Sequence, residues 1–163
     1  MNTLNVDIKA LIETISHEDD NLGKSYLDAI TGEVIYIPTE VSLALEKGTL
    51  KDDFFDNWLK EFVSIAILIS EDEENRYLCT PLIDENFYLS AMKQYVHNIV
   101  DNSDLKQELQ KVLNNNEPVK RFKQVLMDKE NKTEEWYKYE DNCISEFVLD
   151  WLNSNGIEVE FLN

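Results

Sequence analysis

The chain of 163 residues is 43% hydrophobic and 10% aromatic, and it carries a formal net charge of -18. This apolar content is enough for a sizeable core, so we expect a folded acidic protein and exclude a disordered chain. A strong negative field repels nucleic-acid phosphates and anionic lipid, which argues against direct nucleic-acid or membrane binding and favours a basic protein partner.

The cysteines and the apolar runs predict the compartment. Cys79 and Cys143 lie far apart and form no CxxC unit, so we expect reduced thiols. The N-terminus lacks the pattern of a signal peptide, and the longest apolar run, residues 62–69, is shorter than the roughly 20 residues of a membrane span. A cytoplasmic protein is expected, and nothing in the pattern indicates an oligomeric state.

The first predicted elements are a helix and a hairpin. Apolar residues recur at three- and four-residue steps over residues 4–15, which predicts an amphipathic helix. In "YLDAITGEVIYIP" two β-rich runs flank Thr31 and Gly32, and glycine suits a tight turn. We therefore expect an antiparallel hairpin at residues 25–37, with its second strand stopped by Pro38.

Residues 52–81 hold an ambiguous apolar segment and an acidic one. The run at 62–69 fits a buried strand or a helix, and the longer stripe over 52–69 favours the helix. The segment "EDEEN", residues 71–75, is expected to be an exposed loop and the seam between halves of a single domain spanning residues 1–163. A short strand, "RYLCTP", follows it.

Three further helices are expected before residue 127. Asp84 suits the cap of the first helix, and Asp104 with Gln107 resembles a capping box at the start of the second. Pro118 fits the first turn of the third, where its missing N–H would be unpaired anyway. The predicted apolar stripe of the first helix is Tyr88, Met92, Tyr95 and Ile99.

The last helix has the most regular pattern, and Asn155-Gly156 supplies a left-handed stop before a short strand. The predicted fold class is α+β, predominantly α-helical, with a small antiparallel β-hairpin and a C-terminal helical bundle. We expect the core to contain Phe122, Leu126, Trp136, Tyr139, Phe147 and Trp151.

A basic island, "PVKRFKQVL", stands out in the acidic chain. On a helix beginning at Pro118, Phe122 would face the core and Lys120, Arg121 and Lys123 would face solvent. One interpretation is a solvated helix face that pairs with nearby acids, and the other is an interaction site. Three cations do not easily overcome the surrounding field, which disfavours a nucleic-acid contact.

No catalytic motif is recognisable, and we expect no cofactor. His17 and His97 adjoin no nucleophile motif, and four dispersed glycines exclude a phosphate-binding loop. The runs "HEDD" at 17–20 and "EDEE" at 71–74 offer oxygen ligands without EF-hand spacing, so we expect adventitious divalent cation binding. No catalytic residue can be assigned from these patterns.

The order of several short motifs resembles the uncharacterised bacterial protein family UPF0158: "SYLDAITGEVIYIP", "RYLCTP", "YLSAMKQYV", "RFKQVL", "EEWYKYED" and "WLNSNGIEVEF". The resemblance spans residues 25–161 and implies no activity and no catalytic residue. It makes Phe122, Lys123, Leu126 and Trp136 part of a family pattern. Where the family has a glycine and an aromatic residue before "RFK", this chain has "NNNEPV", so a ligand held by the backbone there would lose its site.

These observations lead to two hypotheses of function. The first is a non-enzymatic interaction protein whose acidic residues, Glu71, Asp72, Glu73 and Glu74 among them, bind a basic protein; its sharper version is a nucleic-acid mimic. The alternative is an unrecognised carboxylate-based, divalent-metal-dependent hydrolase.

Overall fold

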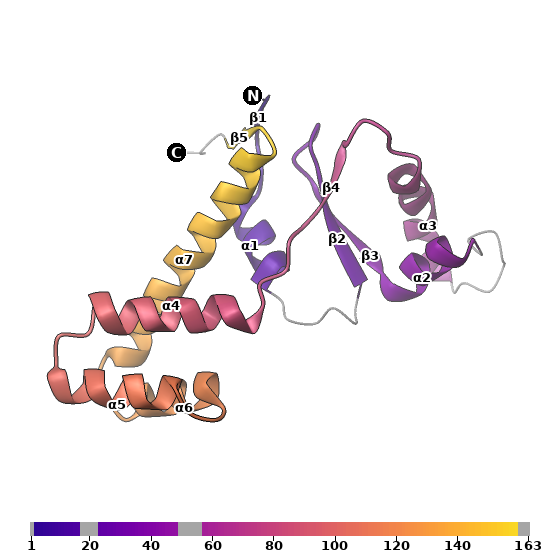
Figure 1. Cartoon of the computed structure of the whole chain (residues 1–163). Coiled ribbons are helices and arrows are strands. Elements are labelled where there is room, and N and C mark those ends of the chain that lie inside the picture. The colour runs from indigo at the N-terminus through magenta and orange to yellow at the C-terminus, as the bar shows by residue number, and fades with distance from the viewer. Residues whose placement is uncertain (1, 17–22, 49–56, 160–163) are drawn as a thin grey trace. The chain divides into compact units, whose positions relative to one another are not determined.

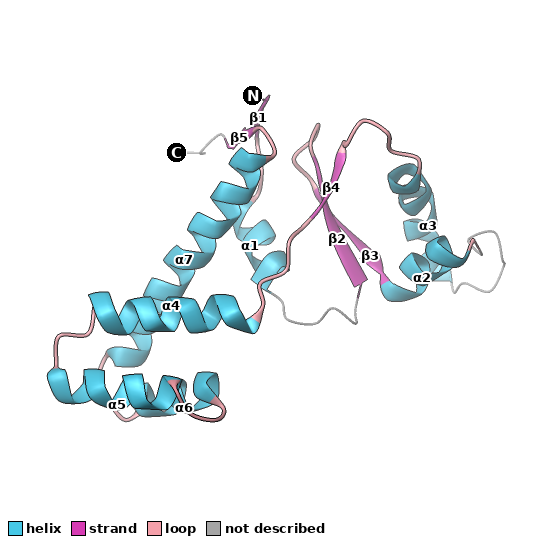
Figure 2. Cartoon of the chain, in the orientation of Figure 1, coloured by secondary structure: helices cyan, strands magenta, loops and turns pink. Residues whose placement is uncertain are grey.

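The computed structural model describes residues 2–16, 23–48 and 57–159, shown by element in Figure 1 and by secondary structure in Figure 2. In these ranges it is α+β and predominantly helical, as the sequence predicts. It has seven helices there, of which the helix Thr39–Lys47 was not predicted. The chain divides into two compact units: unit 1 comprises residues 1–82 and 150–163, and unit 2 comprises residues 83–149. The acidic stretch at 71–75 lies inside unit 1 and not at its boundary.

Unit 1 contains a three-stranded antiparallel sheet of β2 (Gly23–Asp28), β3 (Val34–Pro38) and β4 (Tyr77–Cys79), in the order β3-β2-β4. The predicted hairpin and the short predicted strand are therefore confirmed. Gly32 has a φ of 79°, and a Cβ there would collide with the carbonyl oxygen of Asn5. Only glycine fits this turn, both for its backbone angle and for its lack of a side chain.

Two helices pack against this sheet, α2 (Thr39–Lys47) and α3 (Asn57–Ser70). The ambiguous segment is thus a helix from Asn57 onward, and residues 52–56 lie outside the described ranges. The length of the segment favours the helix, because a strand of fourteen residues would be longer than the neighbouring strands with which it could pair. The sheet, α2 and α3 share one core. It is built from Ile37, Val41, Leu59 and Ala66, with Tyr26, Ile35, Phe62, Ile65 and Ile69 packed against it.

Unit 1 also joins the two ends of the described chain. β1 (Asn2–Leu4) pairs in parallel with β5 (Ile157–Val159), and α1 (Ile8–Ser16) follows β1. The prediction of a helix starting at residue 4 was therefore wrong for its first residues. Asp7 sets the true start, because its Oδ1 accepts a hydrogen bond from the Ala10 N–H at 3.0 Å.

Unit 2 is a helical bundle of α4 (Glu85–Asn98), α5 (Ser103–Leu113), α6 (Pro118–Met127) and the part of α7 (Lys132–Ser154) up to residue 149. Tyr95, Phe122 and Trp136 form its aromatic centre, with edge-to-face ring contacts at centroid distances of 5.1–6.1 Å. The buried Tyr95 hydroxyl donates to Glu135 Oε1 at 2.7 Å, so its polar end is satisfied. Burial, together with Glu135, raises the pKa of Tyr95.

Several helix ends differ from the predictions. Asp84 caps α4 as expected, accepting from the Phe87 N–H at 3.0 Å. The cap of α5 is Asn102 and not Asp104, because the Asn102 Oδ1 accepts from the N–H groups of Asp104 and Leu105. Ile99, predicted in the apolar stripe, is the C-cap of α4 and is 39% exposed.

The predicted core residues differ in burial. Phe122, Leu126 and Trp136 are fully buried, whereas Tyr139, Phe147 and Trp151 are half-buried. On α7 the fully buried positions after Trp136 are Ile144, Val148 and Leu152, and the last two each lie one residue beyond a predicted core residue. One residue turns a helix by about 100°, so the large half-buried side chains lie at the border of the buried face.

The turn into α6 supplies a first prediction. Glu117 caps α6 in the left-handed conformation, with φ 51° and ψ 51°, which glycine adopts without strain. Glu117→Gly should therefore raise the free energy of unfolding by up to about 1 kcal/mol, measured by urea denaturation. Glu130→Gly is the matched control, because Glu130 is exposed and has a negative φ, and it should not stabilise. Equal effects of the two changes would contradict the strain at Glu117.

Candidate interaction surfaces

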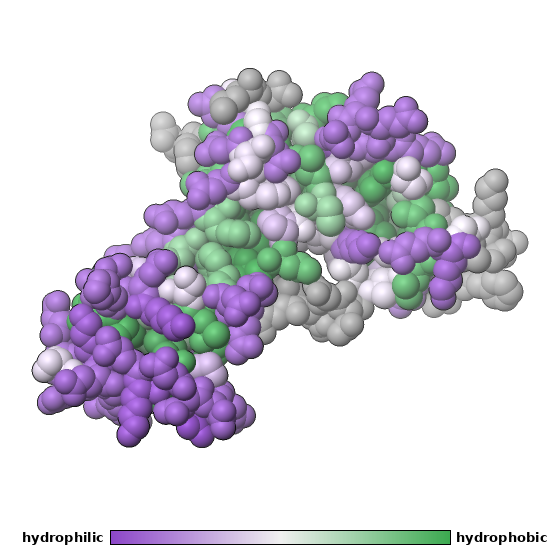
Figure 3. All heavy atoms as spheres, in the orientation of Figure 1, coloured by the Kyte–Doolittle hydropathy of each residue, from purple (hydrophilic) through white to green (hydrophobic). Residues whose placement is uncertain are grey.

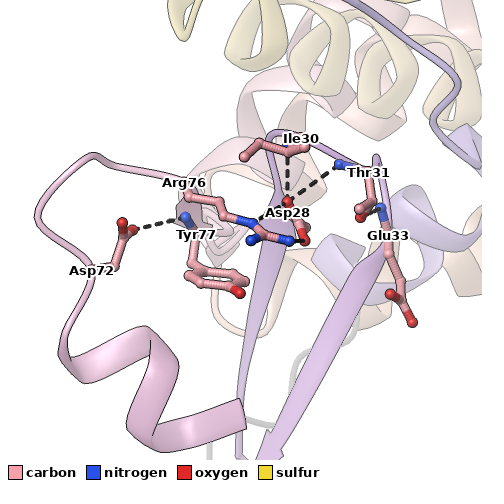
Figure 4. A network of polar contacts seen from close by, with 7 residues as sticks. All are labelled: Asp28, Ile30, Thr31, Glu33, Asp72, Arg76 and Tyr77. Carbon is pink, nitrogen blue, oxygen red and sulfur yellow. Dashed lines mark hydrogen bonds and ion pairs between the residues drawn. The ribbon is translucent and has the colours of Figure 1, made fainter.

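The acidic segment divides by role in the structure. Asp72 is turned back onto its own loop, because its Oδ2 accepts from the Tyr77 N–H at 2.9 Å (Figure 4). Its Oδ1 also accepts from the Glu74 N–H at 3.2 Å. The hydrogen bond from Tyr77 in particular holds the pKa of Asp72 below its usual value. Asp72 therefore closes the loop between α3 and β4 and is not free to bind a partner.

The three glutamates of this segment, Glu71, Glu73 and Glu74, differ from Asp72 in having no side-chain hydrogen bond within the described loop. They are exposed, and their carboxylates make no ion pair or hydrogen bond with any residue that the structure describes. They follow the C-terminal end of α3, which is the negative end of its dipole and has no basic residue in its last turn. The negative charge of these three glutamates is thus not offset by an ion pair with any described residue.

An ion pair between the buried Asp28 and the partly exposed Arg76 fixes the loop in place (Figure 4). Arg76 donates from Nε to Asp28 Oδ1 at 3.0 Å and from Nη2 to Oδ2 at 2.8 Å, and Asp28 is only 3% exposed. Asp28 Oδ1 also accepts from the N–H groups of Ile30 and Thr31. The Arg76 guanidinium, together with these N–H groups, lowers the pKa of Asp28 from its ordinary 3.8 to about 2.

Sequence reasoning missed this pair. An aspartate just before a turn is a recognisable signal, because its side chain often accepts from N–H groups two or three residues later. No local pattern links it to Arg76, which is 48 residues away in the chain. The Asp28–Arg76 pair has a structural role, because it positions the acidic loop.

The net charge is unevenly distributed between the units. Unit 1 contains 20 of the acidic residues and six of the basic ones, whereas unit 2 contains 13 acidic and nine basic residues. The excess of negative charge therefore belongs mainly to unit 1. The two predicted charged segments fall in different units, the acidic one in unit 1 and the basic island in unit 2.

The basic island forms one side of α6. Phe122 and Leu126 are buried, while Lys120, Arg121 and Lys123 are exposed. The expected pairing with nearby acids is not found: none of the three cations forms an ion pair with a described residue. Lys120 and Arg121 also lie near the positive end of the α6 dipole, where a cation is unfavourable. The island therefore does not serve the stability of α6.

Groups that could support other chemistry are sparse. Among residues 2–16, 23–48 and 57–159, no cluster of three or more His, Cys, Asp or Glu side chains is placed to hold a metal ion. The carboxylate run at 17–20 lies outside the described ranges. Cys79 is exposed and Cys143 half-buried, both as free thiols, and burial raises the pKa of Cys143. In the same ranges, no helix has both the length and the apolar character of a membrane span.

Comparison with known proteins gives one family. The model of a family described as "Uncharacterised protein family (UPF0158)" matches residues 1–163. A relative from Pseudomonas aeruginosa, named UPF0158 protein PA5073, is 27% identical over 133 residues, which is 82% of this chain and 73% of the relative. No solved structure matches the chain.

The Asp28–Arg76 pair predicts a defined pH dependence. The folded-state pKa lies below the ordinary value, so the charged carboxylate stabilises the fold fully above about pH 4 and loses this effect as the pH falls towards 2. Asp28→Asn should lower the free energy of unfolding by roughly 2 kcal/mol at neutral pH, with a difference from wild type that shrinks between about pH 4 and 2. Urea unfolding over this range measures it.

The control for this experiment is Glu33→Gln in the same turn, since Glu33 is exposed. It should change the free energy of unfolding little at any pH. A difference between Asp28→Asn and wild type that stayed constant with pH would show that the stabilisation does not come from the carboxylate charge.

The basic island predicts an increase in stability on charge reversal. Lys120→Glu places an acid near the start of α6 and should raise the free energy of unfolding by about 0.3–1 kcal/mol. Lys129→Glu changes the net charge equally but lies just beyond the C-terminal end of α6, where loss of a cation should destabilise. Thermal unfolding at low salt compares them. A loss of stability in Lys120→Glu would instead indicate that the island has a structural role.

Proposed function

The chain belongs to the uncharacterised protein family UPF0158, and from this premise we propose that it is a non-enzymatic interaction protein whose unit 1 binds a basic protein partner. The proposal includes a cytoplasmic location, which two free cysteines support. The partner supplies the cations that unit 1 lacks.

The observation that carries the proposal is the set of glutamates Glu71, Glu73 and Glu74. They are exposed at the negative end of α3 and have no described partner, so they add repulsion without a compensating contact in the fold. The loop that presents them is held by Asp72 and by the Asp28–Arg76 pair. A loop that is already ordered loses little conformational entropy on binding.

A narrower form of the proposal is nucleic-acid mimicry. Here the carboxylates of unit 1 occupy the phosphate-binding site of a DNA- or RNA-binding protein. Carboxylates held on a helix end and an ordered loop support this form, because fixed anions can match fixed cationic sites. Competition with nucleic acid separates it from the broader form.

The test is capture of a partner at low salt with the full chain as bait, from nuclease-treated extract of the source organism, with hits identified by mass spectrometry. Binding of the purified hit is then measured against salt. We expect one basic protein in stoichiometric amount and an affinity that falls steeply with salt. Displacement by added nucleic acid would support mimicry.

Matched variants place the contact on the chain. Changing Glu71, Glu73 and Glu74 to Gln should weaken binding about tenfold or more, because each rim charge contributes about 0.5–1 kcal/mol. The same change at Glu108, Glu130 and Glu146, which are exposed residues of unit 2, should have a much smaller effect. If folded bait retains no basic protein, or if both triple variants weaken binding equally, the assignment to this segment is wrong.

A further inference from the structure

The C-terminal end of α7 is followed by the single Asn–Gly pair of the sequence, Asn155-Gly156. In such a pair the backbone nitrogen of the glycine can attack the side-chain amide of the asparagine, because the glycine is flexible and has no Cβ to block the approach. A bond forms between the Gly156 nitrogen and the Asn155 Cγ, and the bond from Cγ to Nδ2 breaks. The proton of the Gly156 N–H leaves with the ammonia, and water then opens the succinimide ring to aspartate or isoaspartate.

The surroundings of this pair leave room for the reaction. Asn155 is exposed and Gly156 is partly exposed. A Cβ built on Gly156 would meet no atom of the described chain within 4 Å, apart from its own neighbours in sequence. Figure 3 shows hydrophilic surface at this end of α7. Water, the only reactant that the conversion consumes, therefore has access to the pair.

Two hydrogen bonds hold the pair in an unreactive arrangement. The Asn155 Nδ2, which is the leaving group, donates to the Trp151 carbonyl oxygen at 2.8 Å. The Gly156 N–H, which is the attacking group, donates to the Asn153 carbonyl oxygen at 3.0 Å. The Gly156 nitrogen must lose its proton and turn towards the Asn155 Cγ, so its bond to Asn153 has to break first. The reaction therefore requires the C-terminal end of α7 to open.

The position of Asn155 gives the reaction a structural consequence. Gly156 alone separates it from β5, whose Ile157 lies opposite Asn2 of β1. Isoaspartate leads the main chain through the former side-chain carbon, and this extra methylene shifts β5 out of register with β1. Aspartate keeps the register, but a carboxylate oxygen then replaces the N–H donor that faces the Trp151 carbonyl oxygen. It also adds a negative charge at the negative end of the α7 dipole, where the last turn has no basic residue.

We infer that Asn155 is a site of spontaneous deamidation, that opening of the C-terminal end of α7 sets its rate, and that the product loosens the pairing of β1 with β5. A helix end opens at a lower free energy than the whole domain unfolds, so the reaction proceeds in the folded chain. The inference is independent of the proposed partner, because it involves only residues of unit 1 and water.

The first test measures the rate of conversion. The full chain is kept at mildly alkaline pH, and peptide mapping by mass spectrometry follows aspartate and isoaspartate at position 155. A synthetic peptide of residues 151–159 gives the rate without the fold. We expect conversion in the folded chain at a rate at least about tenfold below that of the peptide. No conversion in the folded chain would overturn the site, and a rate equal to that of the peptide would overturn its control by opening.

Two variants test where the chain opens. Leu4→Ala removes a buried side chain of β1 and should speed the conversion about tenfold or more. Leu126→Ala is the matched control, because Leu126 is equally buried but belongs to unit 2, and it should leave the rate unchanged. Equal rates in the two variants would overturn the local opening.

Urea gives the same information without a variant, should Leu4→Ala fail to fold. The conversion in the wild-type chain should accelerate at urea concentrations below the unfolding midpoint, because local opening precedes global unfolding. A rate that stays constant up to the midpoint would overturn the local opening.

A last pair of variants tests the effect of the product. Asn155→Asp reproduces the aspartate form and should lower the melting temperature by about 2–4 °C or more. Asn153→Asp is the matched control: it adds the same charge in the last turn of α7, but the Asn153 side chain forms no hydrogen bond with a described residue. It should lower the melting temperature less. An unchanged melting temperature in Asn155→Asp, or an equal loss in both variants, would overturn the inferred loosening.

Discussion

The described part of unit 1 depends on the carboxylate of Asp28. A carboxylate removed from water is costly unless its oxygens are satisfied, and Asp28 accepts two hydrogen bonds from Arg76 and two from the N–H groups of its own turn. The Ala29 N–H also donates to the Arg76 carbonyl oxygen at 2.7 Å. The hairpin turn and the start of β4 are therefore joined by side chain and backbone alike, which fixes where the acidic loop ends.

Features set by local signals could be predicted from the sequence, and those set by distant contacts could not. The hairpin around Gly32 and the start of α6 at Pro118 follow from single residues with strong conformational preferences. The pairing of Leu4 with Val159 joins opposite ends of the chain, so the apolar period alone extended α1 too far towards the N-terminus. For α7, Trp136 was placed correctly in the core, but the spacing could not distinguish Trp151 from Leu152.

The candidate surfaces show the same limit. Exposure of Glu71 and Lys120 follows from their charge, so composition was enough to predict it. That Asp72 is used within its own loop, and that Lys120, Arg121 and Lys123 lack an acid partner among the described residues, depends on tertiary neighbours.

Under the proposed function, the two charged segments together constrain the partner more than either does alone. A uniformly basic protein would be attracted to unit 1 but repelled wherever it came near Lys120, Arg121 and Lys123 of unit 2. A partner with its cations confined to one patch avoids this repulsion, and so does one that carries acids elsewhere. Under the proposed function, the exposed cations would disfavour non-specific basic proteins. The unfavourable place of Lys120 and Arg121 at the start of α6 is consistent with a role in selectivity, since repulsion of wrong partners contributes to specificity as much as attraction of the right one.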